Sequence, residues 1–140
     1  MGRILAIDYG RKRTGLAVTD EDRIIATGLT TVHSNDVLKF IKDYIKTENV
    51  DCIVVGEPKD MKNLPSEASK YIEPFVGALR KRFPEIKIDR YDERFTSVMA
   101  HDAMLAGGLK KMKRQDKALV DKISATLILQ SYMQSIKFKD

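Results

Sequence analysis

Acidic residues occupy positions where the sequence pattern otherwise calls for apolar side chains. Asp121 lies in a helix predicted over Asp116 to Ser135, on the stripe that apolar residues form at spacings of three and four. Asp8 closes the apolar run that begins at Arg3, which is typical of a central strand covered on both faces. A carboxylate in such surroundings stays ionised only if it is paired, heavily hydrogen-bonded or bound to a metal. The two acids therefore indicate a site.

Further carboxylates follow predicted strands, which is the pattern expected for metal-assisted phosphodiester chemistry. Hard cations such as Mg²⁺ prefer oxygen ligands, and they stabilise the attacking and leaving oxygens of a phosphoryl displacement. Glu57 and the pair Asp92 and Glu93 fall at strand ends, as Asp8 does. If these strands are parallel, their ends share one edge of the sheet, and the last helix can bring Asp121 over it. A charged turn before a helix is the alternative explanation of Asp92 and Glu93.

Two clusters of cations flank the misplaced acids. The turn that follows Asp8 contains Arg11, Lys12 and Arg13. The stretch before the last helix contains Lys110, Lys111, Lys113 and Arg114. A net charge of +5 and a pI of about 9.3 suit a polyanionic partner. Solvated loops are the simpler interpretation of each cluster alone, but their place beside the acids favours contacts with phosphate groups.

The composition is that of a soluble globular protein with one domain. The chain has 140 residues, of which 43% are hydrophobic and 32% charged, and this length can bury an ordinary core. The single cysteine, Cys52, lies in an apolar run and is expected in the core of a protein kept in a reducing cytoplasm. No apolar run approaches the roughly 20 residues of a membrane span. We therefore expect a cytoplasmic protein with a single domain over residues 1–140 and no membrane partner.

The elements that must position these residues are predicted in a simple order. Three strands joined by tight turns come first, over Arg3 to Tyr9, Thr14 to Thr19 and Arg23 to Val32. After them follow a helix from Ser34 to about Thr47, a strand from Cys52 to Gly56, a helix from Ser66 to about Phe83 that contains Pro74, a strand from Ile86 to Tyr91, a helix from Thr96 to Gly107, and the last helix. Strands reached through helices are normally parallel to their neighbours. The order predicts an α/β protein with an antiparallel meander and two parallel strands.

With these residues in view, the chain resembles the YqgF (RuvX-like) family, described as Holliday junction resolvases and as nucleases that mature the precursor of small-subunit ribosomal RNA. The resemblance is nearly full length, and four segments carry it: Ile7 to Val18, Val54 to Pro58, Asp92 to Ser97 and Val120 to Gln130. It implies an RNase H-like fold. In that fold a mixed five-stranded sheet contains a meander of three antiparallel strands and two further strands added by helical crossovers.

The resemblance also implies an active site. Asp8, Glu93 and Asp121 would hold one or two Mg²⁺ or Mn²⁺ ions, with Asp8 bridging the metals. A metal-activated water would then attack the phosphorus in line and leave a 5′-phosphate and a 3′-hydroxyl. The residues expected to hold the substrate backbone are Arg11, Lys12 and Arg94.

Glu57 marks a departure from the family pattern. The middle strand of the family usually ends in Gly-Leu-Pro and is followed by a loop that contains glycine, whereas this chain has Glu57 and no glycine between Pro58 and Pro65. Related resolvases place a catalytic acid at the end of that strand. Glu57 is therefore expected either as a fourth ligand or as a replacement for Glu93, and Glu93 is favoured. The altered loop leaves the substrate preference open.

The leading hypothesis is a metal-dependent nuclease that processes the 5′ end of pre-16S rRNA, resolves Holliday-junction-like DNA, or does both. A monomer or a homodimer fits, since a symmetric junction requires two active sites. One alternative is a piece of an actin-like or sugar-kinase-type ATPase, but such enzymes close two domains around the nucleotide and this chain supplies one. The other is an inactive nucleic-acid-binding module, in which three acids would weaken binding unless a metal neutralised them.

Overall fold

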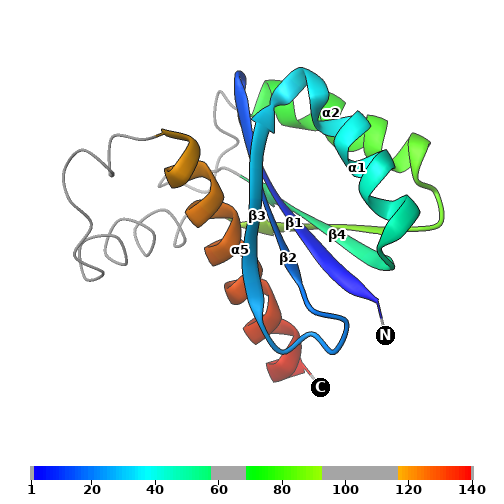
Figure 1. Cartoon of the computed structure of the whole chain (residues 1–140), viewed down its shortest axis with the longest axis vertical. Coiled ribbons are helices and arrows are strands. Elements are labelled where there is room, and N and C mark those ends of the chain that lie inside the picture. The colour runs from blue at the N-terminus through cyan, green and yellow to red at the C-terminus, as the bar shows by residue number, and fades with distance from the viewer. Residues whose placement is uncertain (1, 58–68, 93–116, 140) are drawn as a thin grey trace.

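The structure, a computed structural model, describes residues 2–57, 69–92 and 117–139. These residues form three layers, in which a mixed five-stranded sheet lies between two helices on one face and one long helix on the other (Figure 1). Along the sheet the strands follow the order β3-β2-β1-β4-β5. Their bounds are β1 Arg3–Tyr9, β2 Arg13–Thr19, β3 Ala26–His33, β4 Val50–Glu57 and β5 Lys87–Asp92.

The pairing of the strands confirms the predicted topology. The first three strands form an antiparallel meander, and β4 is parallel to both β1 and β5. The third strand begins at Ala26 rather than at Arg23, because a tight turn occupies the preceding residues. In that turn the carboxylate of Asp20 accepts the backbone N–H groups of Ile24 and Ile25, at 2.7 and 2.9 Å. Arg23 has a positive φ of 57° and cannot extend the strand.

The described helices also follow the prediction, except that the first begins later than Ser34 and the last ends later than Ser135. Their bounds are η1 Ser34–Asp36, α1 Val37–Thr47, α2 Ser69–Arg82 and α5 Lys117–Lys139. Ser34 does not cap α1, because its hydroxyl bonds elsewhere; a single 3-10 turn, capped by His33, leads into the helix instead. Pro74 neither ends nor splits α2 and lies on its exposed side. The helix predicted from Thr96 to Gly107 lies outside the described residues.

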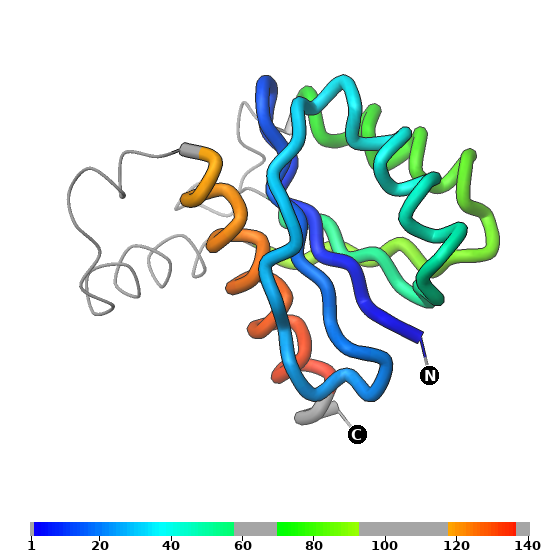
Figure 2. The backbone as a smooth tube through the Cα atoms, in the orientation of Figure 1, coloured from blue at the N-terminus to red at the C-terminus, as the bar shows by residue number. Residues whose placement is uncertain are grey.

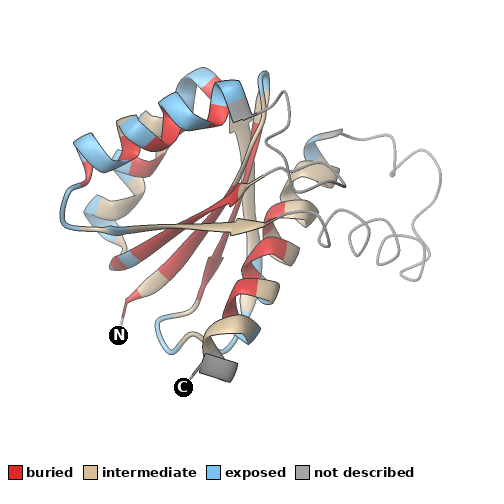
Figure 3. Cartoon of the chain, turned by 180° about the vertical axis from the view of Figure 1, so that it is seen from behind, coloured by how far each residue is buried: buried red, intermediate tan, exposed pale blue. Residues whose placement is uncertain are grey.

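Two apolar layers hold the sheet between its helices, and Figure 3 shows them as buried stretches along the strands. Alternate residues of each strand face opposite sides. Leu5 and Ile7 of β1 pack with α1 and α2, while Ile4 and Ala6 pack with α5. α5 runs along β1, β2 and β3, on the side away from α1 and α2 (Figure 2). Among the described residues, no helix combines the length and the apolar character needed to cross a membrane.

Candidate active site

Asp8 lies on the face of the sheet that α5 covers. Ile4 and Ala6, which alternate with it along β1, belong to the apolar layer beneath this helix. Asp8 continues that alignment near the end of the strand, where the side chain is half-buried. The alternation along β1 therefore places the Asp8 carboxylate near the end of the strand, on the side of α5.

Gly15 allows α5 to approach the strand beside Asp8. It is the antiparallel partner of Asp8 on β2. A Cβ atom at this position would collide with the backbone carbonyl of Asp121, so the helix backbone rests directly on the strand. Directly opposed residues in an antiparallel pair have Cβ atoms about 4.5–5.5 Å apart. The turn of α5 that carries Asp121 is therefore a close neighbour of Asp8.

Arg13 is the partner that the charge of Asp121 requires. Its Nε donates to Oδ2 of Asp121 at 3.0 Å. Arg13 lies two residues before Gly15 on the same face of β2, which makes it the diagonal neighbour of Asp8. The side chains of the pair are 38% and 25% exposed for Arg13 and Asp121. The expected partner is thus present, although Asp121 is less buried than its helical stripe predicted, and Ala118 of that stripe is exposed.

Glu57 and Asp92 lie at the same edge of the sheet but on the other face. They are register partners at the ends of β4 and β5. By alternation they align with Val55, whose side chain packs toward α1 and α2. Glu93, the next residue in the sequence, lies outside the described residues. Within the described part of the chain, no three His, Cys, Asp or Glu side chains form a group that could hold a metal.

The basic turn between β1 and β2 presents exposed cations at this edge. Arg11 and Lys12 are both exposed. The guanidinium carbon of Arg11 lies 4.7 Å from the centroid of the Tyr71 ring in α2, a cation–π contact. Tyr71 is 40% exposed, and the sequence analysis did not single it out. The other predicted nucleic-acid contacts lie outside the described residues, namely Arg94, Lys110, Lys111, Lys113 and Arg114.

Buried hydroxyl groups fix the base of this turn. The Ser34 hydroxyl donates to the backbone oxygen of Gly10 at 2.5 Å and lies 2.9 Å from the Thr14 hydroxyl. The backbone N–H of Ser34 donates to the oxygen of Lys12 at 2.9 Å. Tyr9 packs on the opposite face of β1 from Asp8 and stacks on Phe75, with ring centroids 4.2 Å apart. These contacts stabilise the turn that carries the exposed cations.

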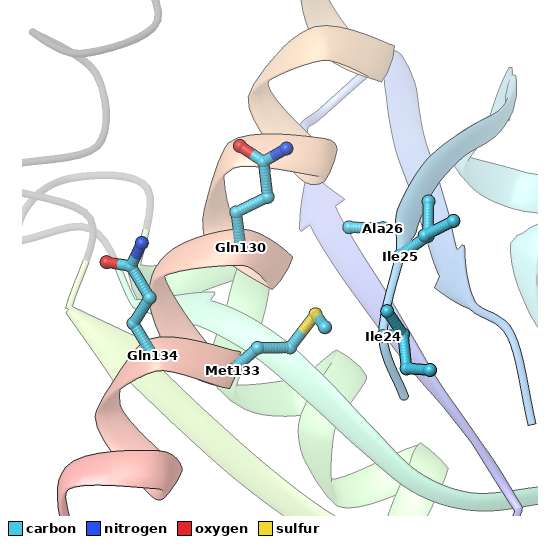
Figure 4. Close-up of a pocket in the computed structure, with 6 residues that line it drawn as sticks. All are labelled: Ile24, Ile25, Ala26, Gln130, Met133 and Gln134. Atoms are coloured by element: carbon cyan, nitrogen blue, oxygen red, sulfur yellow. The ribbon is translucent and has the colours of Figure 1, made fainter. Parts of the chain in front are cut away.

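A depression lies toward the other end of α5 and lacks ionisable side chains. It is formed where the turn before β3 meets the C-terminal half of the helix (Figure 4). The residues that line it are Ile24, Ile25, Ala26, Gln130, Met133 and Gln134. None of these side chains is ionisable, so the depression offers neither acid–base groups nor charged metal ligands. The candidate chemistry stays at the Asp8 and Asp121 end.

Buried Cys52 is a core residue, as predicted. Its Sγ lies 3.8 Å from the Tyr132 hydroxyl, which donates to Oδ2 of Asp89 at 2.8 Å. Burial raises the pKa of the Cys52 thiol, and burial followed by the hydrogen bond to Asp89 raises the pKa of Tyr132. Both groups are therefore neutral at physiological pH. Their contact ties the C-terminal half of α5 to β4 and β5.

Comparisons with known proteins show which family this chain resembles. A family model described as "RuvX: Holliday junction resolvase" matches residues 2–135. A protein of Parabacteroides distasonis named "Putative pre-16S rRNA nuclease" is 60% identical over 139 residues, which cover 99% of both chains. A protein of the same name from Phocaeicola vulgatus is 61% identical over 138 residues, again 99% of both.

A solved structure confirms the expected fold. The chain of "T. thermophilus RuvC in complex with Holliday junction substrate" superposes with a TM-score of 0.56 at 15% identity, over 96% of this chain and 98% of that one. This likeness shows the RNase H-like fold. The match to the family model and the identity to the two relatives extend over nearly the whole chain. The protein therefore belongs to the RuvX family.

Proposed function

We propose that this protein is a metal-dependent nuclease that hydrolyses phosphodiester bonds in structured nucleic acid. Its family and the names of its relatives support the nuclease class. The names favour precursor 16S rRNA as the substrate, of which we propose the 5′ end, and the description of the family favours Holliday junction DNA as the second candidate. The observation that carries the chemistry is the approach of the Asp121 turn to Asp8 over the bare backbone of Gly15.

The residues present suit Mg²⁺ or Mn²⁺. Both ions take carboxylate oxygens as ligands, and Asp8 and Asp121 supply them from two elements that meet at one end of the sheet. The guanidinium of Arg13, 3.0 Å from Asp121, shows that this carboxylate already attracts a cation. When bound, the metal would activate a water molecule and stabilise charge on the phosphoryl oxygens.

Glu93 is the third ligand that we propose. It directly follows β5 in the sequence, and the family motif Asp92 to Ser97 contains it. Glu57 is the weaker choice, because alternation along β4 directs it to the face opposite Asp8. The chain thereby retains three acids for the site without a ligand from the altered loop.

The basic turn would hold the substrate backbone. Arg11 and Lys12 are exposed at the edge that carries Asp8, and Arg11 is steadied by the ring of Tyr71. Contacts of this kind bind phosphate groups without reading sequence, so they suit a structured substrate recognised by shape. A nuclease of ribosomal RNA precursors would act in the cytoplasm, as the composition predicts.

Cleavage of matched substrates tests the proposed function. We would compare a precursor 16S rRNA fragment, single-stranded RNA and a four-way DNA junction, each with Mg²⁺, Mn²⁺ or EDTA. The wild type is expected to cleave at least one structured substrate only when metal is present. Asp8→Asn should lose cleavage and keep binding, because it removes a metal ligand and a negative charge together.

Asp43→Asn is the matched control. Asp43 is an exposed carboxylate on α1 that lies 3.8 Å from Lys46, and its loss should leave cleavage unchanged. Binding of every substrate without cleavage under any metal condition would overturn the enzyme and favour a binding module. Equal loss in both variants would show that the effect is not specific to the candidate site.

A further inference from the structure

Arg13 occupies a central position in the candidate site. It extends from β2 on the α5 face, diagonal to Asp8, and its Nε contacts Asp121 at 3.0 Å. Its guanidinium is therefore a positive charge beside Asp121, on the face of the sheet that carries Asp8.

We propose that Arg13 and the metal ion compete for Asp121. In the metal-free protein the guanidinium neutralises the carboxylate. On metal binding the ion takes over Asp121, and the released guanidinium turns to a phosphate of the bound nucleic acid. This inference rests on the proposed function, since it concerns the same carboxylate and gives Arg13 the role of a substrate contact.

Electrostatics favours the exchange. A guanidinium kept beside a carboxylate that coordinates a divalent cation would face the metal charge at a few ångströms. Two like charges at that distance repel each other. Arg13 is 38% exposed and has a long side chain, so it can leave Asp121 without disturbing the strand.

The geometry also leaves Arg13 suited to a phosphate. Among the described residues it hydrogen-bonds through Nε alone. Its two terminal nitrogens form the planar fork that matches two phosphate oxygens. Arg13 begins β2 directly after the exposed cations Arg11 and Lys12, so it lies next to the turn that would bind the nucleic-acid backbone. A free guanidinium would therefore stand between the backbone-binding turn and the metal ligands.

The competition predicts that loss of Arg13 tightens metal binding. Removing the guanidinium removes the positive charge that the metal must displace from Asp121. We expect Arg13→Gln to bind Mn²⁺ about two- to fivefold more tightly than the wild type, the factor that a part-exposed ion pair is worth. A merely structural ion pair would give the reverse, because its loss would loosen the site.

Arg3→Gln is the matched control. Nε of Arg3 contacts Oε2 of Glu48 at 3.2 Å, with 25% and 37% of the two side chains exposed, at the opposite end of β1. Mn²⁺ would be titrated by calorimetry into the metal-free full-length wild type, Arg13→Gln, Arg3→Gln and Asp8→Asn, without nucleic acid. Arg3→Gln is expected to bind Mn²⁺ as the wild type does.

Thermal unfolding gives an independent readout. In EDTA, Arg13→Gln should unfold at a lower temperature than the wild type, because Asp121 has lost its counter-ion. Saturating Mn²⁺ should raise its Tm more than that of the wild type, since tighter binding to the folded state adds more stability. Arg3→Gln should be destabilised to the same extent in EDTA and in Mn²⁺.

The outcomes separate the two proposals. If Asp8→Asn loses Mn²⁺ binding while Arg13→Gln binds as tightly as the wild type or more weakly, the competition is overturned and the metal site stands. If the wild type binds no Mn²⁺, or Asp8→Asn binds as the wild type does, the proposed function itself fails and the competition fails with it.

Discussion

The two faces of the central sheet bury side chains of different size. On the face toward α1 and α2, β1 and β2 present Leu5, Ile7 and Leu16. On the α5 face the same strands present Ile4 far from the site and, nearer to it, Ala6, Ala17 and Gly15, where the helix backbone touches the strand. Large side chains fill a wide layer, whereas small ones let a helix come close. The face toward α1 and α2 holds the larger side chains, and the other face lets the α5 turn that carries Asp121 approach Asp8.

The comparison predicts that the large effects on stability lie on the α1–α2 face. Leu5 is fully buried there. Leu5→Ala should lower the free energy of unfolding by about 2–5 kcal/mol, the cost of a cavity in a close-packed core. The remaining folded protein should cleave at the wild-type rate, because the site lies across the sheet. Urea unfolding measures the stability, and a cleavage rate per folded molecule measures the activity. If the folded fraction of Leu5→Ala also cleaves more slowly than the wild type, the two faces do not have separate roles.

Gly15→Ala should change the distance between α5 and the strand rather than the packing of the core. A Cβ atom would force the Asp121 turn away from Asp8. We expect metal-dependent cleavage to fall by about 100-fold, as for other small displacements of catalytic groups. Circular dichroism would confirm that the fold is retained.

Gly77→Ala is the control for the glycine change. Gly77 lies in α2 with nothing near the added Cβ. Cleavage should stay unchanged, and the free energy of unfolding should rise by about 0.5–1 kcal/mol, because alanine is the better helix former. Wild-type cleavage by Gly15→Ala would show that the close contact does not matter for the chemistry.

Substitution of the exposed turn should give a smaller effect, confined to binding. Arg11→Gln removes one expected phosphate contact and should weaken binding of structured RNA, reducing the slope of log K against log salt by about one. Lys39→Gln, an exposed change on α1, serves as control and should keep the wild-type slope. Filter binding across a salt series measures the slopes of the wild type and both variants. Identical slopes for all three would show that Arg11 does not contact the nucleic acid.

The smallest effect concerns the far half of α5 and appears only at high pH. Burial, with the hydrogen bond to Asp89, raises the pKa of Tyr132 above its usual value. The folded protein thus holds this proton more tightly than the unfolded chain. Its stabilising contribution is complete below about pH 10, the usual pKa of the phenol, and is lost as the pH rises further.

Tyr132→Phe tests this dependence. The variant lacks the ionisable hydroxyl, so its free energy of unfolding should fall less steeply than that of the wild type above about pH 10. At pH 8 it should be less stable by about 1 kcal/mol, for the lost hydrogen bond. Urea unfolding at both pH values gives the comparison; equal slopes would mean that Tyr132 does not titrate differently in the folded state.

The sequence predicted the layers and the strand order because both depend on local periodicity. Alternation and turn residues located all five described strands, and the acids at Asp8 and Asp121 stood out against that periodicity. The partners of these acids could not be predicted. Arg13 and Asp121 lie 108 positions apart, and only the packed fold brings them together. The role of Gly15, which looks like an ordinary turn glycine in the sequence, is likewise visible only once α5 is in place.

The sequence also did not predict on which face of the sheet each strand-end acid lies. Glu57 ends a strand beside Asp8, yet the register of β4 gives it the opposite face. The hydroxyl of Ser34 resembles a helix cap in the sequence but holds the Gly10 turn instead. Both outcomes depend on register and tertiary contact rather than on residue type.

The most direct test of the central claim is a crystal structure with Mn²⁺, in which anomalous scattering locates the ion. We predict a peak at the Asp8 end of the sheet, coordinated by carboxylate oxygens of both Asp8 and Asp121, with Arg13 withdrawn from Asp121. A protein that cleaves in the same Mn²⁺ but binds the ion at Glu57 and Asp92, on the opposite face, would contradict it.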